Sequence, residues 1–239
     1  MLKLDIPTNM DYLREQYNLD RRLNVLDIWQ RESAQTLAEA LGTKTPFSNA
    51  FFIDNAPQLL ADGELRSLPP EQQQQIHSKI YQNASNGVGY LYGTHRIDRR
   101  PEISPTTPNV LVEAHQLLNS EVMMNFIREL TGYDDIKYAS AQGTRYIPGN
   151  FLTRHNDIVE AEGRRVAFVM GFTPQWHPDW GGNLQFYQDN GLAKNAWMPM
   201  FNNMALFDVK HAHAVTFVAP FARAIRYSIT GWFRANPPA

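Results

Sequence analysis

Three residues in the second half of the chain carry side chains that together could bind a transition metal. His155 and Asp157 are separated by one residue, and His213 follows much later. Two imidazoles and one carboxylate on one face of an Fe(II) ion leave the other coordination positions open for a co-substrate and dioxygen. The chain has no cysteine, which excludes disulfides, iron–sulfur clusters, thiolate-bound zinc and cysteine nucleophiles. Any transition metal must therefore be held by histidine and carboxylate side chains.

Each candidate residue has a competitor or a simpler explanation. His-x-Asp pairs often arise by chance, and His211 could itself chelate a metal together with His213. Arg226 lies on the next predicted strand, where its planar guanidinium would match a carboxylate better than lysine does. Arg223 is a rival for this role, and an arginine in a strand is more often a surface or ion-pair residue. Residue type and spacing alone leave these alternatives open.

A β-rich half of the chain must position these side chains. Residues two apart on an extended strand point to the same face, so His155 and Asp157 could reach one ion. His213 begins a predicted strand over residues 213–218, which a neighbouring strand could bring opposite that pair. Other short strands are predicted at 137–140, 143–146, 165–172, 183–187, 204–207 and 224–233. Regular spacing with Pro, Gly and Asn between the runs is typical of an antiparallel barrel or a double-sheet jelly roll.

The first half of the chain has mixed character. Apolar periodicity predicts helices at 32–41, 71–83, 110–118 and 121–130 and strands at 22–28 and 50–53, and residues 87–92 could be strand or loop. Residues 96–108 contain three prolines and predict a loop. We expect an α+β protein in which a helical and mixed portion, 1–135, is integrated with a jelly-roll catalytic core, 136–239, as one structural domain.

The order of the motifs resembles a known family, the Fe(II)- and 2-oxoglutarate-dependent dioxygenases, and within it the prolyl-4-hydroxylase-like branch. The resemblance covers about residues 138–235. It consists of five elements in order: Tyr146-Ile147-Pro148-Gly149, His155-Asn156-Asp157, Gly181-Gly182-Asn183-Leu184, His213-Ala214-Val215, and Arg226 with Ile229-Thr230 and Trp232. This alignment selects His213 over His211 and Arg226 over Arg223.

The resemblance implies a role for each matching residue. His155, Asp157 and His213 would be the iron ligands, and Arg226 would bind the distal carboxylate of 2-oxoglutarate. Tyr146 would hydrogen-bond the same co-substrate, helped by the Ser228 hydroxyl. The pocket would be lined by Val215 and Trp232. The implied reaction is hydroxylation of a C–H bond with Fe(II), 2-oxoglutarate and dioxygen, releasing succinate and CO2.

Two departures from the family pattern affect the expected site. Prolyl hydroxylases often have a tyrosine on the strand after His-x-Asp, where this chain has Met170-Gly171-Phe172. The interval from His213 to Arg226 also looks extended, by residues 219–222. A loop containing Trp176 and Trp180 precedes the glycine pair and would either cap the barrel or close over the substrate.

The sequence gives less information about the substrate and the partners. Nothing basic or repetitive marks a peptide groove, so the sequence favours a free amino acid or another small molecule, with a protein or peptide residue as the alternative. A non-catalytic cupin-like metal-binding module is a second alternative. The net charge of −2 and Trp232, which replaces the second arginine of the AlkB-like branch, predict no nucleic-acid partner. With no signal peptide or apolar span, we expect a cytoplasmic protein without a membrane partner; its oligomeric state stays open.

Overall fold

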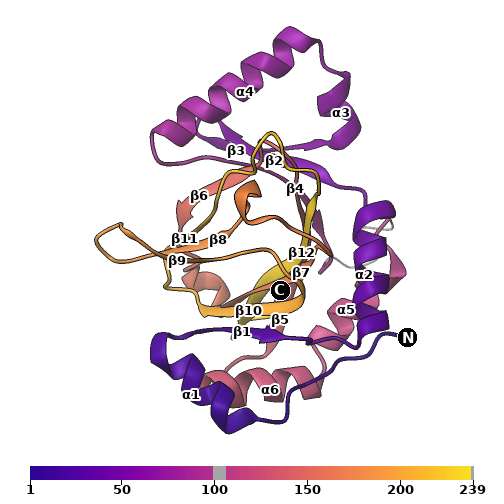
Figure 1. Ribbon diagram of the computed structural model, residues 1–239, viewed down its shortest axis with the longest axis vertical. Helices are drawn as coiled ribbons and strands as arrows, with labels where there is room; N and C mark the ends of the chain where they lie inside the picture. Colours follow the sequence, from indigo (N-terminus) through magenta and orange to yellow (C-terminus); the bar gives the residue numbers. More distant parts are fainter. Residues whose placement is uncertain (99–105, 238–239) are drawn as a thin grey trace.

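The computed structural model describes residues 1–98 and 106–237. They form a curled antiparallel sheet whose outer side carries most of the helices (Figure 1). The helices are α1 (Met10–Asp20), α2 (Arg31–Thr43), α3 (Asp62–Ser67), α4 (Pro70–Ser85), α5 (Asn109–Leu118) and α6 (Glu121–Thr131), with short 3-10 turns at Glu160–Glu162 and Pro178–Trp180. The strands are β1 (Arg22–Leu26), β2 (Ser48–Ile53), β3 (Ala56–Ala61), β4 (Tyr90–Arg96), β5 (Tyr138–Tyr146), β6 (Phe151–His155), β7 (Arg164–Phe172), β8 (Leu184–Tyr187), β9 (Ala193–Trp197), β10 (Phe201–Asp208), β11 (His213–Val215) and β12 (Arg226–Arg234).

The strand order makes the sheet a jelly roll. Hydrogen-bonded neighbours run β1-β10-β7-β12-β5-β4-β6-β11-β8-β9, and strands β2 and β3 branch from β4. Strands that are distant in sequence are therefore adjacent in space, as in β12 between β5 and β7. The fold class expected from the sequence, α+β with a jelly-roll core and packed helices, is confirmed.

Side-chain alternation on the central strands separates the helical core from the barrel interior. On β12, Ile229 and Phe233 are fully buried in the apolar core beneath the helices, together with Leu37 of α2 and Ile127 of α6. The alternate positions, Arg226, Thr230 and Trp232, face a cavity inside the barrel. Because successive side chains of a strand point to opposite faces, one strand serves both the core and the site.

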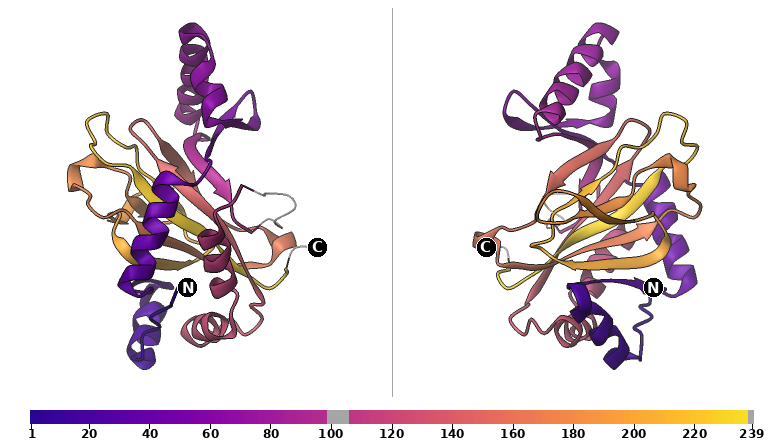
Figure 2. Two further views of the ribbon diagram at one scale, coloured as in Figure 1. Left: turned by 90° about the vertical axis from the view of Figure 1, so that its right-hand side faces the viewer. Right: turned by 60° about the vertical axis from the view of Figure 1, so that its left-hand side comes forward.

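The N-terminal half contributes strands to the same sheet. Strand β4 lies between β5 and β6, and β1 pairs with β10 at the edge. The β2–β3 hairpin with α3 and α4 projects from the barrel at the end opposite α1 and α6 (Figures 1 and 2). Helix α4 is anchored by Ile80, which packs with Phe51, Leu91 and Phe151. None of the described helices has the length and apolarity needed to cross a membrane.

The strand predictions differ from the structure at several boundaries. The two runs predicted at 137–140 and 143–146 form one strand, β5, and the run predicted at 213–218 ends at Val215. Residues 90–96 are a strand, and the predicted 96–108 loop lies partly outside the described residues. Helices α1 and α3 and strands β3 and β9 had no prediction, and for β6 the sequence predicted only an extended segment that contains His155 and Asp157. Strands β3 and β9 are mostly exposed, so they lack the apolar alternation on which a sequence-based assignment depends.

Candidate active site

The three predicted metal ligands converge at one end of strands β6 and β11. Each of His155, Asp157 and His213 offers a ligand atom, and these atoms lie within 4.8 Å of one another. His155 Nε2 is 3.8 Å and His213 Nε2 is 3.5 Å from the Asp157 carboxylate. His155 and His213 are register partners in the β6–β11 pair. Antiparallel pairing therefore brings together residues that are far apart in sequence.

The backbone positions Asp157 beside the two histidines in a way that differs from the prediction. Strand β6 ends at His155, so the two side chains do not share a face of one strand. Instead, the backbone N–H of Asp157 donates to the carbonyl of Val209 at 3.0 Å. The chain is thereby fixed beside the end of β10, and the carboxylate turns back toward the imidazoles.

Both imidazoles are oriented by the backbone. His155 Nδ1 lies 3.0 Å from the carbonyl oxygen of Thr153, and His213 Nδ1 lies 2.9 Å from that of His211. A carbonyl can only accept, so each Nδ1 carries a proton and each Nε2 is the ring atom left to face a metal. Burial lowers the pKa of His213 to about 4, which keeps this ring neutral at physiological pH. Two imidazole Nε2 atoms and a carboxylate are the donor set that suits an Fe(II) site.

A buried cation lies at the inner end of the same cavity. The Arg226 side chain is only 4% exposed, and its Nη1 donates to the Gly182 carbonyl at 2.6 Å. Its Nε is buried without a partner among the described residues, and burial lowers the pKa of the guanidinium. A buried cation with no acidic partner is costly unless an anion joins it. The site therefore fits a carboxylate ligand.

Tyr146 lies beside this cation. Arg226 and Tyr146 are register partners in the β5–β12 pair, and the guanidinium carbon is 5.1 Å from the tyrosine ring centroid. The Tyr92 ring stacks on the Tyr146 ring, with centroids 5.3 Å apart and an interplanar angle of 13°. Burial raises the pKa of Tyr146, so its hydroxyl stays protonated and can donate a hydrogen bond.

The other predicted site residues divide between two cavities. Val215 and Trp232 line the main cavity of about 290 Å³ with the triad and Arg226. Ser228 is buried and lines a smaller space of about 20 Å³ that Arg226 also borders. The rival Arg223 is exposed, whereas Arg226 is buried. The rival His211 bonds the Asp20 carbonyl through Nε2 at 2.8 Å and lies outside the triad.

Several cavity residues carried no expectation from the sequence. Gln142 and Thr144 lie four and two residues before Tyr146 on β5 and line the same cavity. Thr230 lies two residues before Trp232 on β12 and also lines it. The period-two pattern could have identified them once the strands were extended over their full length. Tyr90 and Tyr92 of β4 also line the cavity, but only the position of β4 between β5 and β6 places them there.

Gly171 explains one departure from the family pattern. A side chain at this position would meet the Met200 carbonyl oxygen and the Asn203 side chain of β10. Gly171 and Asn203 border the small space beside Arg226 and Ser228, so Met200 and Asn203 leave no room for a tyrosine side chain at position 171. Asn202 and Asn203 both belong to β10.

The Trp176–Trp180 loop packs against residues that surround Arg226. The Trp176 indole N–H donates to the Gly181 carbonyl at 2.8 Å, and its ring packs with Tyr146, Val215 and Val218. Trp180 meets Trp176 edge-on at 5.4 Å. A Cβ on Gly182 would press on Trp176 and Val218, so the glycine permits this close packing. The loop therefore lies at the end that contains Arg226.

A jelly-roll barrel with two imidazoles, one carboxylate and a buried arginine in one cavity is the arrangement expected of a non-haem iron oxygenase. The model of the 2OG-Fe(II) oxygenase superfamily matches residues 141–234, a span that contains every predicted site residue. Prolyl 3-hydroxylase OGFOD1 of Mus musculus is 29% identical over 130 residues, 51% of this chain. The Xenopus laevis protein of the same name is 30% identical over 121 residues, 47% of this chain. The matches span 23% of each relative.

Solved structures share the fold. A prolyl-4-hydroxylase of Pseudomonas putida superposes with a TM-score of 0.60 at 16% identity, covering 94% of this chain and 98% of that one. A prolyl hydroxylase of Trichoplax adhaerens, in complex with a peptide of hypoxia inducible factor, gives 0.59 at 18% identity, covering 95% and 89%. Residues 141–234 are therefore similar to the 2OG-Fe(II) oxygenase superfamily, and the overall fold is similar to that of these prolyl hydroxylases. The His155-Asp157-His213 triad has the ligands that an iron site in such an oxygenase requires.

Proposed function

We propose that this protein is an Fe(II)- and 2-oxoglutarate-dependent dioxygenase of the prolyl-4-hydroxylase-like branch, with Fe(II) held by His155, Asp157 and His213. Its substrate would be a prolyl residue of a protein or peptide. The observation that supports the assignment is the convergence of these three side chains in one cavity with the buried Arg226. With 2-oxoglutarate and dioxygen, the iron supplies the oxidising power to hydroxylate an aliphatic C–H, releasing succinate and CO2.

The protein's own residues position and protect the co-substrate. Arg226 would bind the distal carboxylate of 2-oxoglutarate with its unpartnered Nε and its remaining Nη2, since Nη1 is engaged by Gly182. The protonated Tyr146 hydroxyl would donate to the same carboxylate, and Ser228 would assist from its neighbouring position on β12. Because the inner end of the barrel is buried, these charge-assisted bonds would act in a low-dielectric environment. Val215 and Trp232 would form part of the wall.

The substrate assignment depends on the relatives. The two curated relatives are named prolyl 3-hydroxylases, and a fold neighbour was solved with a bound peptide. The small-molecule substrate favoured by the sequence finds no support among them. The non-catalytic module is set aside because the family is one of enzymes.

A surface groove supports an extended substrate. The groove, of about 390 Å³, shares Leu152 and Val215 with the main cavity. Tyr81 of α4 and Phe217 line it and are 44% and 46% exposed, with the Phe151 ring stacked on Phe217 at 5.9 Å. Grouped exposed aromatic side chains mark binding surfaces, so we propose that part of the polypeptide substrate lies here.

A substrate screen that measures succinate release tests the proposal. The iron-loaded enzyme is given 2-oxoglutarate with prolyl peptides, with matched peptides that contain alanine for proline, or with free amino acids. We expect prolyl peptides alone to raise succinate release above the substrate-free rate, and Asp157→Ala to abolish both rates. Stimulation by free proline or another amino acid, with none by peptides, would overturn the substrate assignment but leave the oxygenase in place.

A further inference from the structure

The aromatic groove proposed above for the substrate contains one cationic side chain. Of the described residues that line this groove, Arg154 alone carries a charge, and the others have apolar, aromatic or hydroxyl side chains. Arg154 is exposed, and it immediately precedes the proposed metal ligand His155 at the end of β6. Because consecutive Cα atoms are about 3.8 Å apart, the residue that carries this charge is adjacent to the metal site.

The fold positions this guanidinium without neutralising it. Its central carbon lies 5.7 Å from the centroid of the Tyr187 ring, a contact that stabilises a cation over an aromatic face. In the turn between β8 and β9, a Cβ at Gly191 would lie only 2.7 Å from Arg154 Nη1, so the glycine lets the guanidinium approach the backbone. Among the described residues, no carboxylate forms an ion pair with Arg154. Its charge is therefore available to a ligand in the groove.

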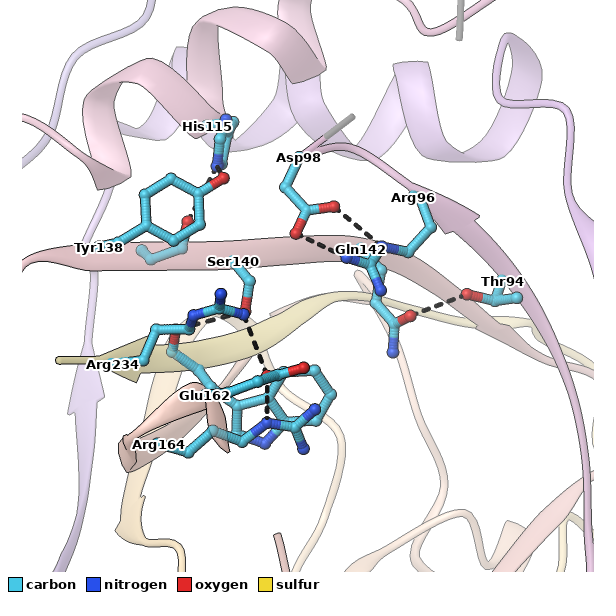
Figure 3. Close-up of polar contacts among 12 residues, drawn as sticks. Thr94, Arg96, Asp98, His115, Tyr138, Ser140, Gln142, Glu162, Arg164 and Arg234 are labelled. Carbon is cyan, nitrogen blue, oxygen red and sulfur yellow. Dashed lines mark hydrogen bonds and ion pairs between the residues drawn. The ribbon is translucent and has the colours of Figure 1, made fainter. Parts of the chain in front are cut away.

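Arginines elsewhere on the barrel have carboxylate partners. Arg164 Nε and Arg234 Nη1 donate to the same oxygen of Glu162 at 2.8 and 3.0 Å. Arg96 donates to the two carboxylate oxygens of Asp98, each at 2.8 Å. Figure 3 shows both sets of contacts. These charges are paired within the fold and need no ligand, which distinguishes them from the arginine of the groove.

We infer that the substrate polypeptide carries an acidic side chain near its proline, and that this side chain pairs with Arg154. The inference rests on the proposed function and adds a substrate preference to it. The groove continues into the main cavity through the shared residues Leu152 and Val215, so a polypeptide whose proline enters the cavity would place flanking residues in the groove. There an apolar side chain would pack on Phe217, and an aspartate or glutamate would meet the guanidinium, whose planar fork matches a carboxylate. Complementary charge of this kind selects among substrates.

A charge scan of a peptide substrate tests this pairing. The probe is the prolyl peptide that most stimulates succinate release, and each position flanking its proline is replaced in turn by glutamate, glutamine or lysine. With the iron-loaded wild-type enzyme, we expect a position at which glutamate lowers the KM about three- to tenfold relative to glutamine, and at which lysine raises it. Higher ionic strength should reduce this difference, because salt screens exposed charges.

Variants at position 154 show whether this arginine causes the preference. Arg154→Gln should abolish the difference between glutamate and glutamine, Arg154→Lys should retain part of it, and Arg154→Glu should reverse the preference toward lysine. Arg223→Gln is the matched control, because Arg223 is exposed and lies outside the groove, and it should keep the wild-type preference. Each KM ratio compares two peptides on the same protein, so a variant of lowered stability still reports the preference.

The possible outcomes separate this inference from the proposed function. If the peptides are hydroxylated but glutamate and glutamine give equal KM values at every position, the charge pairing is refuted and the prolyl hydroxylase assignment stands. A preference for glutamate that persists in Arg154→Gln refutes the role of Arg154 in the same way. If no prolyl peptide stimulates succinate release, the substrate assignment and this inference fail together.

Discussion

His155 and His213 face each other across the β6–β11 pair, with ring centroids 4.2 Å apart and each Nδ1 bonded to the carbonyl two residues before it. The same local geometry on both strands directs both Nε2 atoms toward Asp157. Since the backbone supplies the orienting acceptors, the donor set exists before the metal binds.

Removing any one ligand should abolish iron binding. His155→Ala, Asp157→Ala and His213→Ala should each weaken Fe(II) affinity by more than the roughly 10–100-fold typical of an outer partner. His211→Ala is the matched control, because its side chain bonds the Asp20 carbonyl and lies outside the triad. Anaerobic Fe(II) titration measures the affinities. Full iron binding by the Asp157 variant, or its loss in the His211 variant, would contradict the assignment.

The buried arginine should control the affinity for 2-oxoglutarate. Charge-assisted hydrogen bonds contribute about 1.5–3 kcal/mol, so Arg226→Ala should raise the KM for 2-oxoglutarate about ten- to hundredfold. Arg226→Lys should recover only part of this loss, because it keeps the charge but lacks the planar fork. Arg223→Ala, at the exposed rival position, should leave the KM unchanged. Steady-state succinate release measures all three, and an effect confined to Arg223→Ala would reverse the assignment.

The aromatic groove should matter for long substrates only. Phe217→Ala and Tyr81→Ala remove exposed aromatic surface from the groove, and each should raise the KM for a stimulating peptide several-fold. The KM for a blocked prolyl dipeptide should not change, because that probe is too short to occupy both groove and cavity. Tyr12→Ala on α1, 57% exposed, is the aromatic control. Equal effects on both substrates would argue against the groove as part of the binding surface.

An ion pair beneath α3 should make stability depend on pH. Arg145 donates to Asp62 through Nη1 at 2.8 Å and Nη2 at 2.6 Å, and this bonding holds the pKa of Asp62 below its ordinary value of 3.8. The lowered pKa means that the carboxylate stabilises the fold above about pH 4, and that this contribution disappears as the pH falls through the lowered value. Asp62→Asn should reduce the free energy of unfolding by about 1–3 kcal/mol at neutral pH.

Denaturant unfolding at several pH values measures this effect. The difference between wild type and Asp62→Asn should shrink on acidification, because the wild-type carboxyl then becomes neutral as well. Glu39→Gln is the control, since Glu39 and Lys44 are 63% and 61% exposed and such pairs contribute about 0–1 kcal/mol. A pH-independent difference for Asp62→Asn would show that packing, and not charge, explains the loss.

The family resemblance predicted which residues lie together better than how the backbone holds them. It selected His155, Asp157, His213 and Arg226, and the structure brings these four side chains to one cavity; their roles stay predictions. The path of Asp157 was predicted wrongly, because its position depends on a backbone bond to Val209 that no local pattern encodes. Tyr92 was missed for the same reason. A strand from the first half of the chain pairs inside the barrel, and pairing across such a distance leaves no periodic signal.

The central claim is that turnover of 2-oxoglutarate is coupled to oxygen transfer onto a prolyl residue. Mass spectrometry of a stimulating peptide, after reaction under isotopically labelled dioxygen, tests it most directly. The account predicts one labelled oxygen atom on the proline for each succinate released, and none with Asp157→Ala. Succinate released at the stimulated rate with no labelled oxygen on the peptide would contradict it.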